Sequence, residues 1–208
     1  MEKSSLERLA PLSGMVGIVG LLAAAMVTGL FFYLPTADVL TEFFAANLTR
    51  ISAGAYIGLL SSALVLWFSA SLWEDLRRHE GASGRVSGLA FAGGAAAGLS
   101  VGLGFAVLLS ASSRAGAPGG LDPVAAVTLY DLFGNLAGTL FAVTLAVMIG
   151  ATAVVSLRHG AFPSWFGWTS AVLAVTLLSP FGYIGLYVAI LWIATASVWV
   201  YLRGRSAG

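Results

Sequence analysis

The sequence predicts an all-α integral membrane protein, a bundle of six transmembrane helices that forms a single domain over residues 1–208. Two observations predict this class. Hydrophobic residues make up 59% of the chain and charged residues only 9%, whereas a soluble domain carries about 25% charged residues. The apolar residues also gather into runs of roughly 20, the length that a helix needs to cross the hydrocarbon core of a bilayer. Lipid is therefore expected to be the main solvent of this chain.

Residue types that are missing or misplaced exclude several kinds of site. The chain has no cysteine, which removes disulfides, thiolate metal sites and iron–sulfur clusters. Its two histidines, His79 and His159, both fall in polar loops, where they cannot supply the axial ligands of a haem inside the bundle. The net charge of +1 gives no field that would attract nucleic acid. We therefore expect no cofactor, no metal, no catalytic residues and no nucleic-acid partner.

The first two helices are expected at residues 12–34 and 51–73, each an apolar run bounded by polar residues. The first run is too long for the apolar region of a secretory signal peptide, so we expect it to be retained. The segment between the two helices, TADVLTEFFAANL, combines Asp38 and Glu42 with leucine and phenylalanine. This pattern predicts a short amphipathic helix that lies at the membrane interface or forms a lid over the bundle.

The third helix, expected at residues 86–110, contains the strongest signal for helix packing. Gly94, Gly98 and Gly102 recur every four residues, so they form one smooth stripe on the helix. Small residues at this spacing allow another helix to approach closely. The stripe predicts either packing within the bundle or a subunit interface in a homo-oligomer, and the sequence leaves both open.

The fourth helix, expected at residues 128–156, places a carboxylate and a carboxamide on one face. Asp131 and Asn135 lie four residues apart in the stretch LYDLFGNLAGTLFAV. Asp131 is expected near the outer membrane interface and Asn135 one turn deeper. Asp131 either satisfies free N–H groups at the start of the helix or contacts a ligand or ion. Arg50, at the outer start of the second helix, is its predicted salt-bridge partner.

The last two helices are expected at residues 165–178 and 182–202, and the short connection between them predicts a tight helical hairpin. Tyr183 and Tyr187 lie four residues apart near the outer end of the sixth helix. They are expected either to anchor that end at the membrane interface or to line a pocket together with Asp131.

The distribution of basic residues predicts that both termini are cytoplasmic. Positively charged residues concentrate on the cytoplasmic side of membrane proteins. The residues expected on that side are Lys3, Arg8, Arg77, Arg78, Arg85, Arg158, Arg203 and Arg205, against Arg50 and Arg114 on the other. In the charged loop at residues 72–85, Glu74 and Asp75 are expected to pair locally with Arg77 and Arg78.

Three passages resemble a family of bacterial multi-pass membrane proteins catalogued as domain of unknown function 4386. They are the charged stop LWEDLRRHEG, the small-residue helix LAFAGGAAAG, and the passage GATAVVSLRHGAFPSWFGWTSAVLAV. The resemblance covers residues 45–180. It implies a six-helix membrane protein without an established activity, so it assigns no catalytic residues.

The expected function is non-enzymatic. We expect a protein of the bacterial cytoplasmic membrane that binds a membrane lipid, a hydrophobic small molecule or a partner subunit. The predicted ligand-binding residues are Arg50, Asp131, Asn135, Tyr183 and Tyr187. A small channel or transporter is the alternative, although few polar residues are expected deep in the helices. A lipid-modifying enzyme would need convergent acid–base groups, which only the outer carboxylates could provide.

Overall fold

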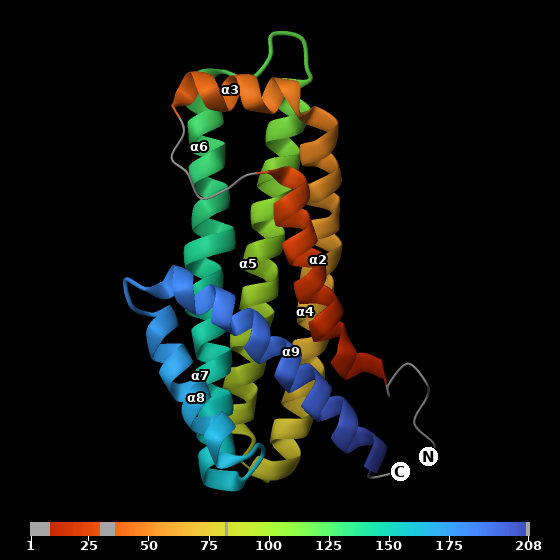
Figure 1. Cartoon of the computed structure of the whole chain (residues 1–208), viewed down its shortest axis with the longest axis vertical. Helices are drawn as coiled ribbons and strands as arrows, with labels where there is room; N and C mark the ends of the chain where they lie inside the picture. Colours follow the sequence, from red (N-terminus) through yellow and green to blue (C-terminus); the bar gives the residue numbers. More distant parts are fainter. Residues whose placement is uncertain (1–8, 30–35, 82, 207–208) are drawn as a thin grey trace.

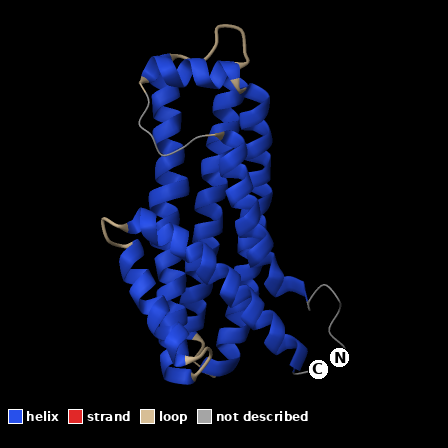
Figure 2. Ribbon diagram, viewed as in Figure 1, coloured by secondary structure: helices blue, strands red, loops and turns tan. Residues whose placement is uncertain are grey.

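The computed structural model describes residues 9–29, 36–81 and 83–206, and every regular element in these ranges is a helix. Figure 1 labels the helices, and Figure 2 shows the short loops that join them. The elements are η1 (Ala10–Leu12), α2 (Ser13–Thr28), α3 (Ala37–Ala46), α4 (Leu48–Glu80), α5 (Arg85–Ala115), α6 (Pro123–Gly134), η2 (Asn135–Leu140), α7 (Phe141–His159), α8 (Ser164–Leu177) and α9 (Gly182–Ser206).

Five of these helical segments are long and apolar enough to cross a membrane, which supports the predicted class of helical membrane protein. They are Ala10–Thr28, Leu48–Glu80, Arg85–Ala115, Pro123–His159 and Gly182–Gly204. The predicted span at residues 165–178 is a helix, α8, but its 14 residues are about 21 Å long. That length is shorter than a hydrocarbon core of about 30 Å, so six full spans are not confirmed.

Two parts of the sequence predictions fall on residues that the structure does not describe. Residues 30–34 of the first predicted helix lie outside the described residues, and so do Lys3 and Arg8 of the charge count. The described part of that helix, η1 and α2, ends at Gly29, which adopts a positive φ of 68° and donates its N–H to Ala25.

Helix α4 lies between α2 and α5 and packs on both through glycine. A Cβ at Gly20 of α2 would lie 2.1 Å from the Ser61 hydroxyl of α4. On the other side of α4, a Cβ at Gly58 would lie 2.3 Å from the ring of Phe105 in α5. In a membrane, where lipid is as apolar as leucine, such close approach supplies the dispersion energy that holds helices together.

The three predicted stripe glycines pack inside the chain against α4. A Cβ at Gly94 would lie 2.3 Å from the Ser69 hydroxyl, and one at Gly102 would lie 2.7 Å from the Ser62 hydroxyl. Gly98 faces Leu66 at 2.9 Å, and all three glycines are buried. The intramolecular alternative is therefore the one that the structure contains, and the stripe leaves no open face for a second chain.

Helices α6, η2 and α7 form one continuous segment beside α5, and they include a six-residue π-helix, η2. Gly93 and Gly104 of α5 set the spacing between the two helices. A Cβ at Gly93 would lie 2.6 Å from the Met148 backbone nitrogen, and one at Gly104 would lie 2.9 Å from Ala137 Cβ. The segment begins at Pro123 rather than near Thr128 as predicted, because the apolar turn before Thr128 is also helical.

Helices α8 and α9 form the predicted hairpin, which is held together by aromatic side chains. The rings of Phe162, Phe166 and Trp192 stack in series, with centroids 4.8 and 5.5 Å apart. Trp192 donates its indole N–H to the Ser170 hydroxyl at 2.7 Å. The turn between α8 and α9 lies at about mid-height of the molecule, and α9 then runs diagonally back to the end where α2 begins (Figure 1).

Helix α3 lies across the other end of the bundle, over α6, α5 and α4 (Figure 1). Its residues Leu40 and Phe44 are buried against these helices, whereas Asp38 and Glu42 are exposed. The amphipathic helix predicted for this segment is confirmed, and it occupies the position of a lid. We call this end of the molecule the α3 end and the opposite end, which holds the α4–α5 and α7–α8 turns, the turn end.

At the turn end, Glu80, the last residue of α4, caps the start of α5 and so joins the two helices. Its carboxylate accepts hydrogen bonds from the backbone N–H groups of Val86 at 2.9 Å and Ser87 at 2.7 Å, and from the Ser83 hydroxyl at 3.0 Å. These N–H groups belong to the first turn of α5 and have no partner within the helix.

We expect Glu80→Ala to lower the free energy of unfolding by about 1–2 kcal/mol, because a helix start loses its charged cap. Thermal unfolding in detergent measures the change. Glu74→Ala is the control, since Glu74 makes an exposed ion pair within one helix and should change stability by less than about 0.5 kcal/mol. Equal losses in the two variants would contradict the capping role.

Candidate functional site

Asp131 is not at a helix start, so the capping role considered for it is wrong. The cap of α6 is Asp122, whose carboxylate accepts from the N–H groups of Val124 at 2.9 Å and Ala125 at 3.2 Å. Pro123, which has no N–H group, occupies the first helical position. Asp131 lies in the third turn of the same helix, where the backbone N–H groups are already bonded within the helix.

Asn135 stands at the point where the α-helix changes into the π-helix η2. Its side-chain Nδ2 donates to the backbone oxygen of Asp131 at 2.9 Å, and its own backbone N–H also points to that oxygen. In a π-helix the backbone hydrogen bonds span five residues instead of four. At the junction between the two patterns, the side-chain amide of Asn135 supplies an additional hydrogen-bond donor. Such π-helical segments are rare in proteins, and those that occur inside α-helices are often found at functional sites.

Asp131 and Asn135 lie on the face of the helix that points away from the bundle. The α5 contact is made by the opposite side of the helix, where Phe133 meets Phe105 with ring centroids 5.7 Å apart. Both polar side chains are exposed, and a Cβ at neighbouring Gly134 would meet nothing within 4 Å. Within the described part of the chain, the Asp131 carboxylate has neither an ion pair nor a hydrogen-bond donor.

The packing contacts fix the depth of this face relative to the rest of the molecule. Phe133 contacts Phe105, which in turn covers Gly58 of α4, so Asp131 lies within about a turn of Gly58 in height. The charged end of α4 begins at Glu74. With a helical rise of 1.5 Å per residue, Asp131 is roughly 27 Å from that level. This distance is close to the thickness of a hydrocarbon core, and Asn135 lies one turn closer to the level of Glu74 than Asp131 does.

The predicted salt bridge between Arg50 and Asp131 is wrong. Arg50 instead donates from Nε to the Val27 carbonyl at 2.6 Å and from Nη2 to the Met26 carbonyl at 3.3 Å. These are among the last carbonyls of α2, which have no partner within the helix and attract a positive charge. Arg50 therefore joins the end of α2 to the start of α4.

We expect Arg50→Ala to lower the free energy of unfolding by about 1–2 kcal/mol, because two helix-end carbonyls lose a charged donor. Asp131→Ala should leave thermal stability in detergent unchanged within about 0.5 kcal/mol, since surface substitutions away from such contacts rarely matter. Equal losses of stability in the two single variants would contradict this expectation and indicate that Arg50 and Asp131 do form a salt bridge.

The structure does not bring Tyr183 and Tyr187 to Asp131. Both tyrosines are exposed, at 64% and 61%, on the first turns of α9. A Cβ at Gly150 of α7 would lie 3.5 Å from Ala174, which places the end of α8 about level with residue 147 of α7. Asp131 is then roughly 24 Å further along the helix. The five predicted ligand residues therefore fall into three separate places: Asp131 with Asn135, Tyr183 with Tyr187, and Arg50 alone.

A cleft at the α3 end, which sequence reasoning missed, lies directly above this face. It has a volume of about 580 Å³ between the end of α5 and the first turns of α6. Its lining consists of Arg114, Gly120, Leu121, Asp122, Val124, Ala125, Thr128 and Leu129. Thr128 also belongs to the face of Asp131, one turn away, so the cleft and the face are continuous. The charged residues Arg114 and Asp122, which flank the loop after the long apolar helix, were the signal for it in the sequence.

A second polar cluster at the turn end was also missed. Arg203 of α9 lies 3.7 Å from an Asp75 carboxylate oxygen and 3.3 Å from His79 Nε2, and it donates to the Ala161 carbonyl. Its guanidinium also lies over the rings of Phe162 and Trp199. Only Glu74 and Arg78 form the predicted local pair. The cluster fastens α9 and the α7–α8 turn to α4, and we interpret it as structural.

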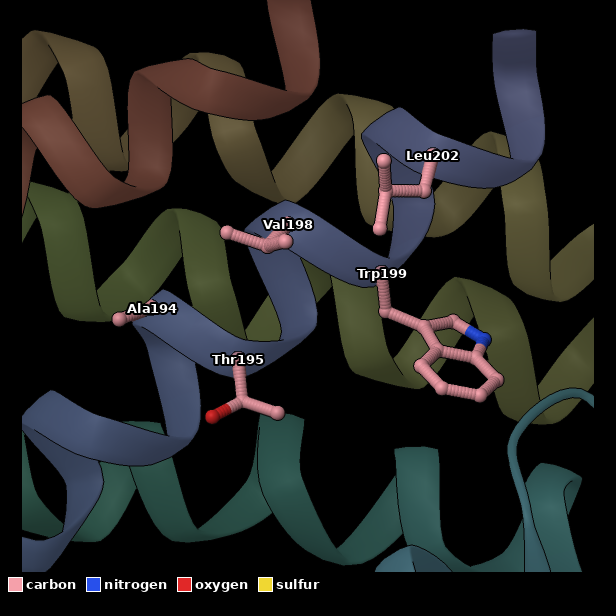
Figure 3. Close-up of a pocket in the computed structure, with 5 residues that line it drawn as sticks. All are labelled: Ala194, Thr195, Val198, Trp199 and Leu202. Atoms are coloured by element: carbon pink, nitrogen blue, oxygen red, sulfur yellow. The ribbon is translucent and has the colours of Figure 1, made fainter.

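A shallow groove of about 340 Å³ follows α9 near this cluster (Figure 3). It is lined by Ala194, Thr195, Val198, Trp199 and Leu202, with Trp199 extending towards the α7–α8 turn in Figure 3. The Thr195 hydroxyl donates to the Leu191 carbonyl at 2.8 Å. The groove presents no charged group and no acid–base pair, so it offers no chemistry beyond apolar contact.

Two of the hydroxyl residues that a channel would need are used in contacts between helices. Ser61 and Ser62 are buried against glycines and donate to carbonyls of their own helix, Ile57 at 2.7 Å and Leu59 at 2.7 Å. Among the described residues, no group of three or more His, Asp or Glu side chains could hold a metal ion. The polar groups that the structure does bring together are Asp131 and Asn135, on one exposed face of α6 and η2.

Comparison of the chain with protein-family models, with curated proteins and with solved structures finds no match. The resemblance to the family of unknown function therefore stays a prediction.

Proposed function

We propose that this protein is a non-enzymatic component of the bacterial cytoplasmic membrane that binds a membrane lipid on the outward face of α6 and η2. One observation carries the proposal. Asp131 and Asn135 present polar groups to the outside of the bundle, with no described partner for the carboxylate, and in this proposal they lie at the boundary of the hydrocarbon layer. Ionisable residues at membrane depth normally face the bundle interior, so an outward pair indicates something bound outside.

The surroundings of the pair suit a lipid with one polar and one apolar part. Leu132 lies beside Asp131 and is 44% exposed, and Leu140 and Val143 continue the face beyond Asn135 at 44% and 42% exposed. Between them the face also carries the exposed Thr139. Gly134 and Gly138 lie beside them with nothing within 4 Å of a Cβ. A headgroup near Asp131 would therefore leave room for an acyl chain along the apolar side chains of Leu140 and Val143.

The proposal includes an orientation in which both termini are cytoplasmic and the α3 end is outside. The start of α2 and the end of α9 lie at the same end of the molecule (Figure 1). That end also carries Arg77, Arg78, Arg85 and Arg158, as the positive-inside rule requires of a cytoplasmic side. The α8–α9 hairpin enters the membrane and leaves it from this side, which reconciles six membrane-embedded helical segments with a short α8.

The test is mass spectrometry of the lipids that remain with the protein after gentle extraction from its own membrane. We expect the native chain to retain a stoichiometric lipid, which Asp131→Ala loses and Asp38→Ala keeps. Asp38 is a matched control because it is an exposed carboxylate at the same end of the molecule. A native chain that carries no lipid would overturn the proposal, and a retained protein partner would favour the role of a subunit.

A further inference from the structure

We infer that the lipid bound at this face carries a primary ammonium headgroup, as an ethanolamine phospholipid does. The inference rests on the proposed function and adds the chemistry of the headgroup. The headgroup chemistry follows from the donors and acceptors of Thr128, Asp131 and Asn135 that are not already used in hydrogen bonds within the helix.

The face offers mainly hydrogen-bond acceptors. Thr128 donates its only hydroxyl proton to the Val124 carbonyl at 2.8 Å, and Asn135 uses one N–H on the Asp131 carbonyl at 2.9 Å. The oxygens of the Asp131 carboxylate and of the Asn135 amide keep their lone pairs, and no described residue donates to them. A negative, acceptor-rich face is complementary to a cation with several N–H donors, and a primary ammonium has three.

The order of the groups along the helix matches the order of groups in such a lipid. Asn135 lies one turn closer to the middle of the membrane than Asp131, and it has one side-chain N–H left to donate. In an ethanolamine phospholipid the phosphate lies between the acyl chains and the ammonium. The phosphate then accepts from Asn135, the ammonium donates to Asp131, and the acyl chains follow Leu140 and Val143 towards the centre.

A choline headgroup satisfies this face poorly. It has the same charge and the same phosphate, but its nitrogen carries three methyl groups and no N–H donor. An anionic glycerol headgroup places no cation beside Asp131. When the acyl chains are identical, a difference in binding between the ethanolamine and choline lipids reports hydrogen bonding by the ammonium group. The anionic glycerol lipid reports the contribution of the positive charge.

The experiment is native mass spectrometry of the full chain released from lipid nanodiscs that hold equal amounts of ethanolamine, choline and glycerol phospholipids with the same chains. We expect the native chain to retain the ethanolamine lipid about tenfold over the choline lipid, as a lost charge-assisted hydrogen bond implies. Asp131→Asn should remove most of this preference. Glu42→Gln, which changes another exposed carboxylate at the α3 end, should keep it.

The other outcomes separate the inference from the proposed function. Equal retention of ethanolamine and choline lipids, both lost in Asp131→Asn, would overturn the ammonium inference and leave lipid binding intact. A chain that retains no lipid in any variant would overturn both. A second protein chain held in place of lipid, through a lysine or arginine opposite Asp131, would also overturn the inference.

Discussion

Replacing Gly93 by alanine is expected to lower the folded yield of the protein more than any other single methyl addition. The new Cβ would lie 2.6 Å from the Met148 nitrogen and 2.9 Å from the Thr144 oxygen. Both atoms belong to the backbone of α7, so no side chain can rotate to make room. The two helices must separate, which we expect to cost at least about 3 kcal/mol, at the upper end for overpacked sites. Thermal unfolding in detergent and the monodisperse fraction after extraction measure the effect.

Gly134→Ala is the matched control for this prediction. Gly134 is also a helical glycine, but a Cβ there would meet nothing within 4 Å. Alanine favours a helix over glycine by roughly 0.5–1 kcal/mol, so this variant should be as stable as the native chain or slightly more stable. If both variants unfold at the same temperature, close packing between α5 and α7 does not limit stability.

Replacing Arg203 by alanine is expected to have the second largest effect. The side chain of its partner Asp75 is only 12% exposed, and one of its oxygens is buried without a hydrogen bond. Removing the guanidinium leaves a nearly buried carboxylate without its positive partner and frees the Ala161 carbonyl. We expect a loss of about 2–4 kcal/mol, somewhat below the figure for fully buried pairs because Arg203 is partly exposed.

Two further variants test whether the Arg203 effect comes from the unpaired carboxylate. Arg78→Ala removes a guanidinium from an ion pair whose side chains are 54% and 60% exposed, so it should cost less than about 0.5 kcal/mol. Replacing Arg203 and Asp75 together by methionine and leucine should recover part of the loss, because both charges are then gone. A double variant less stable than Arg203→Ala would show that cation–ring packing, rather than the carboxylate, dominates.

The helices could be predicted from the sequence because apolar runs and their polar boundaries are local signals. Some boundaries were not predicted. The start of α6 at Pro123 was missed because the residues up to Val127 read equally well as an apolar loop. The shortness of α8 was visible in the sequence, but length alone does not say whether a segment crosses or turns back. The π-helix η2 has no sequence signature, since it depends on how α5 and α6 pack.

The candidate site was predicted in part, and the misses concern long-range pairing. Asp131 and Asn135 share a face because helical spacing is fixed by geometry. The partner of Arg50 could not be predicted, because helix-end carbonyls attract a guanidinium without leaving any residue pattern. Asp75 and Arg203 lie far apart in the sequence, and a charge count places them on one side of the membrane without joining them. Which acceptor an arginine reaches depends on the angles at which the helices pack, and the amino-acid composition carries no information about these angles.

The α8–α9 hairpin gives the molecule the shape of a wedge. Its turn lies at about mid-height, so it adds two helices to the turn end and none to the α3 end (Figure 1). In the proposed orientation the turn end lies on the cytoplasmic side, so the protein would displace more area from that leaflet than from the other. A bilayer relaxes this imbalance when it bends with the crowded leaflet on the convex side. Curved regions of that sign are consequently where the protein should accumulate, independently of any ligand.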